Sequence, residues 1–203
     1  MKTLNLQFLK KSRLKQGDIF AMLMSDGKYL FGRIIRDKLT FQNSPFGGSY
    51  LIYIYNVRSP DKTVDYSRLN PDNLLIPPMY TSNILWNKGY AVKVANFGIS
   101  NEDLLKQHCF YSTTHKEYLD ENGVKIARKT EPCGEWTYVV GLGYIDNKIS
   151  DALNIKRAPM IESDLFYFSG RGEKIWLKKT LSELKKYSSY EEIIEKYPEV
   201  VER

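Results

Sequence analysis

Four residues of this chain have side chains that commonly bind zinc or take part in nucleophilic catalysis: His108, Cys109, His115 and Cys133. His108 and Cys109 are adjacent, so in an extended strand their side chains point to opposite faces. No Cys-x-x-Cys or His-x-x-x-His spacing places two ligands together. We therefore expect no metal and no cofactor. In a chain this long, two cysteines are expected to be buried thiols rather than a disulfide.

Other catalytic patterns are equally weak. Ser112 and Thr113 lie close to the histidines in the sequence, but no nucleophile elbow surrounds them. The glycines of residues 170–173 lack the Lys-Ser/Thr that follows in a phosphate-binding loop. The sequence therefore predicts no catalytic residues and a protein that is not an enzyme.

Arg33 is a charged residue in an otherwise apolar run, and it directly follows Gly32. A glycine within a strand often marks a bulge or a close backbone approach, and Asp18 and Asp26 lie near the ends of the same segment. Two interpretations stay open. Arg33 forms a structural ion pair, which we favour, or it contacts a ligand or partner.

The positive charge is concentrated in the first third of the chain. The net charge is +6, and residues 1–60 contain ten Lys/Arg against three Asp/Glu, whereas residues 61–203 contain twenty against twenty-one. Such a cluster suits nucleic acid, an anionic surface or an acidic protein, or simply keeps the chain soluble. Lys28, Arg36 and Trp86 are the candidate partner-binding residues. Trp86 is included because it precedes Asn87-Lys88-Gly89 in an expected exposed loop.

A β-hairpin is the first element that must position these residues. Residues 18–24 and 29–35 are apolar runs that flank Ser25-Asp26-Gly27-Lys28, and Asp-Gly between such runs is a strong hairpin signal. Residues 50–57 form a third expected strand with alternating aromatic residues. The three sequential antiparallel strands predict a small barrel or a twisted sheet.

The rest of the chain is expected to contain more strands, and helices near its end. Residues 61–83 hold Pro71, Pro77 and Pro78, which indicate a long connection and a possible seam within one domain of residues 1–203. Expected strands cover residues 90–97, 109–113, 136–145 and 164–169, with a helix starting near 101 and a second hairpin turn at 120–123. Capping boxes at 180–183 and 189–192 begin two short helices. The predicted fold is α+β and mostly β: an antiparallel SH3-like small barrel or a strongly twisted sheet with short C-terminal helices.

The hydropathy pattern predicts no contact with a membrane. The longest apolar runs, residues 51–55 and 138–145, are much shorter than the roughly 20 residues of a membrane-spanning helix. The first residues contain lysines but no apolar stretch typical of a signal peptide. We expect a cytoplasmic protein.

The segments 13–21 and 26–35 resemble the immunity protein 26 family of bacterial polymorphic toxin systems. The shared pattern is a Gly-Asp-Ile-Phe strand start, an Asp-Gly-Lys-Tyr turn and a Phe-Gly-Arg strand. Residues 89–94 and 136–141 are similar to later strand blocks of that family. The positions that carry the resemblance are Gly17, Asp18, Phe20, Gly27, Tyr29, Phe31, Gly32 and Arg33.

The resemblance implies a cytoplasmic immunity protein that binds a cognate or rival toxin without catalysis of its own. Because the chain is basic, we expect it to meet an acidic face of the toxin, through the first hairpin and the loop around Trp86. A different class is kept as the alternative. Small barrels of addiction-module endoribonucleases also have Gly-Asp and Gly-Arg strands, and Arg33 with a basic groove would suit RNA cleavage or plain nucleic-acid binding.

Overall fold

The computed structural model describes residues 4–40, 47–127, 133–136, 140–158, 168–170, 173–175 and 201–202. The chain divides into two compact units. One unit is Asn5–Arg157, and the other combines Met1–Leu4 with Ala158–Arg203. Each unit is described by itself.

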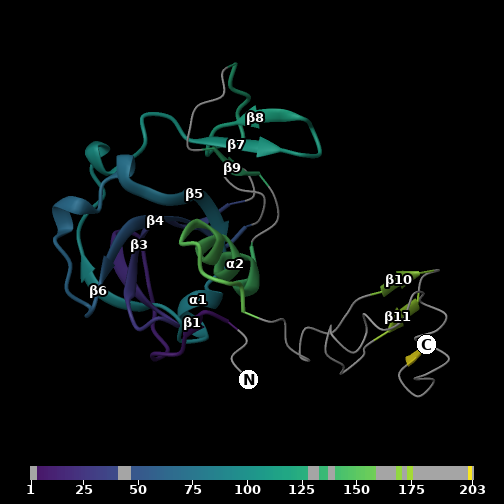
Figure 1. Cartoon of the computed structure of the whole chain (residues 1–203). Coiled ribbons are helices and arrows are strands. Elements are labelled where there is room, and N and C mark those ends of the chain that lie inside the picture. The colour runs from purple at the N-terminus through teal and green to yellow at the C-terminus, as the bar shows by residue number, and fades with distance from the viewer. Residues whose placement is uncertain are drawn as a thin grey trace. The chain divides into compact units, whose positions relative to one another are not determined.

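An antiparallel sheet forms the centre of the unit Asn5–Arg157 (Figure 1). Its strands are β1 (Leu6–Gln7), β2 (Asp18–Met24), β3 (Tyr29–Leu39), β4 (Ser49–Ser59), β5 (Leu74–Thr81) and β6 (Val92–Asn96). Strands β1 to β5 are neighbours in sequence order. Strand β6 pairs with the first half of β2, on the edge where β1 pairs with its second half.

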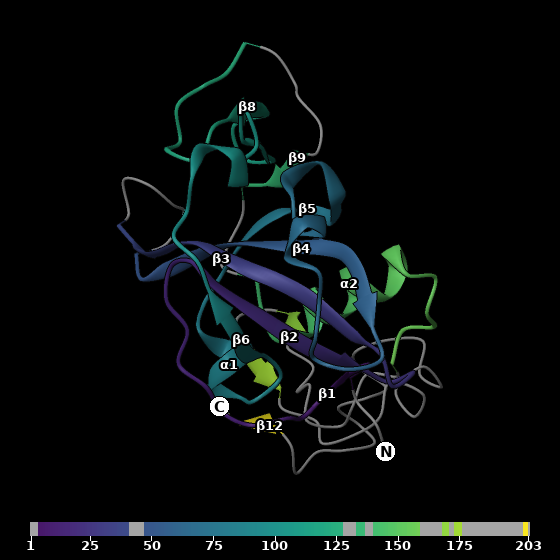
Figure 2. The same ribbon diagram turned by 90° about the vertical axis from the view of Figure 1, so that its left-hand side faces the viewer.

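The long strands of this sheet are irregular, and the sheet curls (Figure 2). The β3–β4 pairing shifts register three times, between Leu30 and Gly32, between Ile34 and Arg36, and between Arg36 and Leu39. Such bulges bend a strand and increase its twist. The expectation of a mostly β chain built on a twisted antiparallel sheet is confirmed.

The predicted first hairpin is confirmed, because its turn has the expected geometry. Gly27 adopts φ +81°, a conformation that glycine reaches without strain. The Met24 N–H donates to Lys28 O and the Gly27 N–H to Met24 O, which closes the turn. The expected third strand is also confirmed as β4.

The segment 61–83 contains more regular structure than its prolines suggest. Two 3₁₀ turns, η1 (Tyr66–Arg68) and η2 (Pro71–Asn73), precede strand β5. Pro77 and Pro78 lie inside β5, where the register with β4 shifts between the pairs Ile54–Ile76 and Ile52–Met79. A proline is tolerated in an edge strand or at a bulge because no ladder bond needs its nitrogen.

The second half of the unit adds a small sheet and three short helical segments. The sheet has β7 (Cys109–Ser112) between β8 (Glu117–Leu119) and β9 (Cys133–Glu135), with β7 and β9 parallel. The helical segments are α1 (Ile84–Asn87), η3 (Asn101–Asp103) and α2 (Leu142–Ala152). The strands expected over 90–97 and 109–113 are confirmed as β6 and β7, and the short helix expected from about residue 101 is the single 3₁₀ turn η3. Gly123, at φ +77°, makes the expected turn after β8.

The strand predicted for residues 136–145 is wrong at its end, and residues 137–139 of that segment lie outside the described residues. Residues 142–145 begin helix α2, whose buried side chains Ile145, Asp146, Ile149 and Ser150 follow a helical spacing. The apolar run was too short to separate a strand from a helix by its pattern alone. No helix of the described residues is long and apolar enough to cross a membrane.

Both faces of the central sheet are covered. One face carries Ile19, Phe31, Tyr53 and Tyr55, which cluster with Leu69 and Phe110 from later segments. The alternate residues, Phe20, Met22, Leu30, Ile34 and Ile52, are equally buried on the other face. Burial on both faces explains why the strands read as continuous apolar runs.

The second unit contains a three-stranded antiparallel sheet of β10 (Phe168–Gly170), β11 (Glu173–Ile175) and β12 (Val201–Glu202). The strand expected over 164–169 is described only at its end, as part of β10. The two helices expected from 180 and 189 lie outside the described residues.

Candidate partner-binding surface

Gly17 and Asp18 hold the loop that follows β6. Gly17 has φ +83°, and a Cβ there would lie 2.3 Å from the carbonyl oxygen of Phe97. Asp18 is buried, and its carboxylate accepts hydrogen bonds from the Lys15 N–H (2.9 Å) and the Asn96 side chain (2.6 Å). Lys93 balances its charge at 2.8 Å. Both residues therefore fix the end of β6 against the start of β2.

Arg33 holds the same loop from the neighbouring strand. Its guanidinium donates to the carbonyl oxygens of Gly98 (2.8 Å) and Phe97 (3.3 Å) and pairs with Asp103 in η3 at 2.5 Å. Arg33 is only 4% exposed. Burial raises the pKa of the Asp103 carboxyl group. The hydrogen bonds from the Ser100 N–H and from Arg33 lower it by more, so the pKa lies below its usual range.

The two interpretations of Arg33 are thereby separated. Arg33 forms an ion pair, but its partner is Asp103 and not either hairpin aspartate, because Asp26 pairs with Arg58 at 2.6 Å. The distance in sequence, from Arg33 to Asp103, is why the sequence did not reveal this pair. Arg33 is buried and both of its terminal nitrogens are engaged within the fold, so it is not placed to contact an RNA substrate.

The other positions of the Gly-Asp and Gly-Arg motifs have packing roles. A Cβ at Gly32 would lie 2.4 Å from the Phe20 ring and 2.7 Å from Tyr53 O. Phe20 and Phe31 are fully buried on opposite faces of the sheet. Tyr29 is half-buried, and Lys62 lies over its ring. These motif positions therefore stabilise the fold. Through Gly17, Asp18 and Arg33 they also hold the loop 96–103 in a fixed position.

The three residues predicted to bind a partner do not form one surface. Lys28 is exposed in the hairpin turn, whereas Arg36 lies eight residues further on, about 25 Å along β3. Arg36 is engaged with Glu121 at 3.1 Å and with Asn122. Lys28 and Arg36 therefore lie at separate places along the hairpin, and Arg36 is held by the turn that follows β8.

The expectation of an exposed Trp86 is wrong. Trp86 lies in α1, is 2% exposed and packs edge-to-face on Tyr50 with ring centroids 4.8 Å apart. Asn87-Lys88-Gly89 is the end of this helix, where Gly89 takes φ +88°, and not a free loop. The Trp86 carbonyl oxygen accepts the Ser12 N–H at 3.0 Å, so Trp86 supports the segment that covers it.

That covering segment carries a group of exposed cations. We call Lys10, Lys11, Arg13, Lys15 and the neighbouring Lys88 the basic strip; all five are exposed. None of them takes part in an ion pair within the part of the chain that the structure describes. Figure 2 shows the segment between β1 and β2 running beside β6 and α1.

Exposed aromatic residues lie at both ends of the basic strip. Phe8 is 64% exposed. A Cβ on Gly89 would lie 2.5 Å from its ring, so the ring can pack there only because residue 89 is a glycine. At the other end, the Phe97 N–H donates to Gly17 O, and Phe97 forms an edge-to-face pair with Tyr66 at 5.0 Å. Their exposed fractions are 46% and 42%.

A second polar cluster connects the small sheet to the central one. The Nδ1 of buried His108 lies 3.2 Å from Glu121, and its Nε2 lies 2.5 Å from the Tyr53 hydroxyl. The hydrogen bond with His108, together with the charge of Arg36, lowers the pKa of Glu121 to about 2. Burial raises the pKa of Tyr53 to about 12. All four side chains have partners inside the protein, so the cluster is a structural connection.

The residues considered for zinc do not assemble into a metal site. Cys109 and Cys133 face each other across β7 and β9, with sulfur atoms 2.6 Å apart, while His108 is engaged as above and His115 is exposed in the β7–β8 turn. Among the described residues, no group of three or more His, Cys, Asp or Glu side chains could hold a metal ion.

Comparison with known proteins decides which family this architecture represents. The family model described as immunity protein 26 matches residues 15–116, half of the chain. The chain belongs to the immunity protein 26 family. No curated protein and no solved structure matches it.

The span shared with the immunity protein 26 family corresponds to a defined part of the fold. It runs from Lys15, just before β2, to Lys116, after β7, and so includes the loop 96–103 with its Asp18 and Arg33 contacts. Phe8, Lys10, Lys11 and Arg13 precede the matched span. In this immunity protein 26 member, three of the five cations of the basic strip, Lys10, Lys11 and Arg13, thus lie outside the span that matches the family.

Proposed function

We propose that this protein is a non-catalytic immunity protein of a polymorphic toxin system, which binds a protein toxin in the bacterial cytoplasm and neutralises it. The observation that carries the proposal is the immunity protein 26 match over residues 15–116. Direct binding is the simplest way for a chain of this family to protect a cell, because inhibition then requires only a complementary surface.

The surface of the unit Asn5–Arg157 supports a binding role. The basic strip is exposed, and Phe8, Phe97 and Tyr66 leave aromatic area in contact with solvent. Aromatic side chains are enriched among the residues that dominate protein interfaces. The engagement of Arg33 within the fold also removes the residue on which the endoribonuclease alternative depended.

The test is neutralisation of the toxin domain encoded next to this chain. We expect the purified chain to form a complex with that domain, seen by size-exclusion chromatography and calorimetry, and to restore growth of cells that express the active toxin. An unrelated immunity protein serves as the control. Absence of a complex together with absence of rescue contradicts the proposal, as does rescue that requires turnover of a substrate by this chain.

A further inference from the structure

The segment that precedes β2 is held in a fixed conformation although it contains no helix or strand. The Leu9 N–H donates to Gly89 O at 2.7 Å and the Ser12 N–H to Trp86 O at 3.0 Å. Leu14 is buried, and the Lys15 N–H donates to the Asp18 carboxylate. These anchors alternate with Lys10, Lys11 and Arg13, whose side chains are exposed. The backbone anchors therefore fix the positions of the three cations relative to one another.

Little within the described part of the unit offsets this charge. Asp18 and Asp37 are the acidic groups that contact the segment, and both do so through backbone N–H groups of Lys15 and Gln16. Asp18 is also buried and balanced by Lys93. The cations of the basic strip thus remain available to an external partner of opposite charge.

Phe8 adds an apolar contact to this charged surface. Its ring lies on Gly89, where a positive φ and the absence of a Cβ are both required. An aromatic ring that is 64% exposed yet held in place loses little freedom when it enters a pocket on a partner. At the far end of the segment, the Phe97–Tyr66 pair offers a second aromatic contact, fixed by Arg33 and Gly17.

We propose that the basic strip, with Phe8 and Phe97 at its ends, is the toxin-binding surface, and that it recognises a carboxylate-rich face of the toxin that has an apolar recess for Phe8. This inference rests on the proposed function. Charged groups around aromatic anchors are typical of specific protein interfaces. Single-stranded nucleic acid is instead bound by aromatic side chains placed among the cations, on which successive bases stack.

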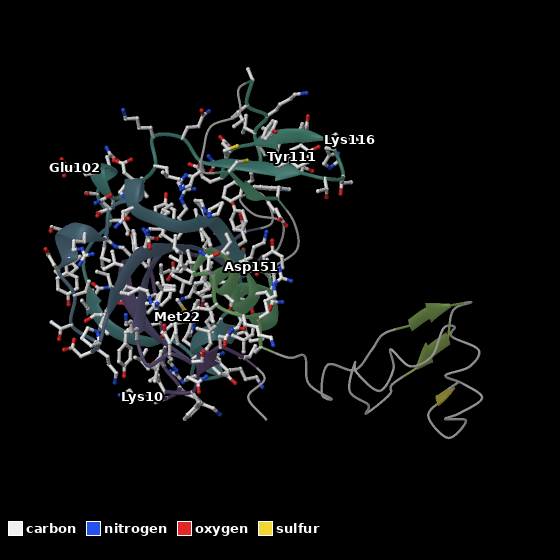
Figure 3. All side chains as sticks on the ribbon, viewed as in Figure 1. Lys10, Met22, Glu102, Tyr111, Lys116 and Asp151 are labelled. Carbon is white, nitrogen blue, oxygen red and sulfur yellow. The ribbon has the colours of Figure 1, made fainter. Side chains whose placement is uncertain are left out.

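Two sets of variants separate this surface from unspecific charge. The first carries Lys11→Glu and Arg13→Glu, and a second variant is Phe8→Ala. The matched control carries Lys106→Glu and Lys116→Glu, which change the net charge equally at exposed positions near the small sheet. Figure 3 shows Lys10 and Lys116 at opposite ends of the unit. Melting temperatures confirm that each variant is folded.

Association with the inactivated toxin domain encoded next to this chain is then measured at low and high salt. We expect the strip variant to associate at least about tenfold more slowly at low salt, with a smaller difference at high salt, because charge steers the encounter. The Phe8→Ala variant should dissociate about tenfold faster. The control variant should differ from the natural chain by less than about threefold.

Each outcome bears on a different claim. If the natural chain does not bind the toxin domain, the proposed function fails. If it binds and the strip and control variants bind alike, the function stands and the proposed surface is wrong. Salt-dependent binding of the natural chain to single-stranded RNA, lost in the strip variant while toxin binding persists, also overturns the proposal, because the strip would then be a nucleic-acid surface.

Discussion

Gly32 lies where the Phe20 ring and the backbone of β4 leave no room for a methyl group. A Cβ at this position would lie 2.4 Å from the Phe20 ring and 2.7 Å from the Tyr53 carbonyl oxygen, which belongs to the backbone of β4. We expect Gly32→Ala to lower the free energy of unfolding by about 1–3 kcal/mol, the usual cost of overpacking a core. Denaturant unfolding measures the change.

Gly98 provides the matched control. It also lies in contact with Arg33, through its carbonyl oxygen, but a Cβ there meets nothing within 4 Å and its φ is not positive. Gly98→Ala should therefore change stability by less than about 0.5 kcal/mol. Equal effects of the two substitutions would show that steric contact at Gly32 does not explain the Gly-Arg pattern.

Glu121 should make stability depend on acid pH. Its pKa is lowered from 4.5 to about 2 in the folded protein, first by the hydrogen bond with His108. A depressed carboxyl pKa stabilises the fold above the unfolded value, and this contribution is lost as the pH falls from about 4.5 toward 2. Glu121→Gln should be less stable by about 1–3 kcal/mol at neutral pH, and the difference should shrink over that window.

The pH series of urea unfolding for Glu121→Gln and the natural chain measures this difference. The control is Glu117→Gln, which removes a carboxylate that pairs with exposed Lys125 and should have little effect. A constant difference between Glu121→Gln and the natural chain from neutral pH down to pH 2 would contradict the role of the Glu121 charge.

The roles of single residues were predictable only where they depend on near neighbours in sequence. The positive φ of Gly27 follows from an Asp-Gly turn between two strands. The partner of Arg33 is 70 residues away, so no local pattern reveals Asp103. Trp86 was misplaced because a helix end and a loop have the same Asn-Lys-Gly composition, and only the fold shows that α1 is covered by residues 8–15.

At the scale of elements, β9 is held to β7 by a short parallel pairing in which Cys109 and Cys133 are directly opposite. Neighbouring strands lie about 4.8 Å apart, within the Cα separation that a disulfide needs. We expect oxidised glutathione to convert the two thiols to an intramolecular disulfide, releasing two molecules of glutathione. The bond should raise the stability by about 2–4 kcal/mol, because it closes a loop of residues 109–133.

Mass spectrometry and thermal unfolding test this conversion. The oxidised chain should be lighter by two hydrogens and melt at a higher temperature, and a reductant should reverse both changes. The variant Cys109→Ser with Cys133→Ser should show neither. Glutathione that remains attached to one cysteine, without ring closure, would contradict the proximity of the two sulfur atoms.

The elements that the sequence predicted well are those with strong turn chemistry between long apolar runs, such as β2, β3 and β4. Strand β5 was missed because Pro77 and Pro78 normally interrupt strands, yet here they lie at a register shift on an edge. The sequence predicts a strand at the start of helix α2 because the apolar run there is too short to show a helical spacing. In both cases long-range packing decides the structure, and local composition does not reveal it.

At the scale of the whole molecule, the features that define the fold and the proposed function are concentrated in one of the two units. The match to the immunity protein 26 family, the residues of the central core cluster and the basic strip all lie within the unit Asn5–Arg157. That unit buries apolar residues from Leu6 to Ile149. A unit with its own core is expected to fold without the rest of its chain.

Truncation after Arg157 tests this partition and, with it, the location of toxin binding. We expect a chain of residues 1–157 to unfold cooperatively and to retain the β-rich circular dichroism of the full chain. Because the basic strip and both aromatic ends are present, its affinity for the inactivated toxin domain should stay within about threefold of the full chain. The same truncated chain carrying Lys11→Glu and Arg13→Glu is the matched control and should bind more weakly. A truncated chain that folds but no longer binds would place essential contacts in residues 158–203, whereas one that fails to fold would show that the core of residues 5–157 is incomplete by itself.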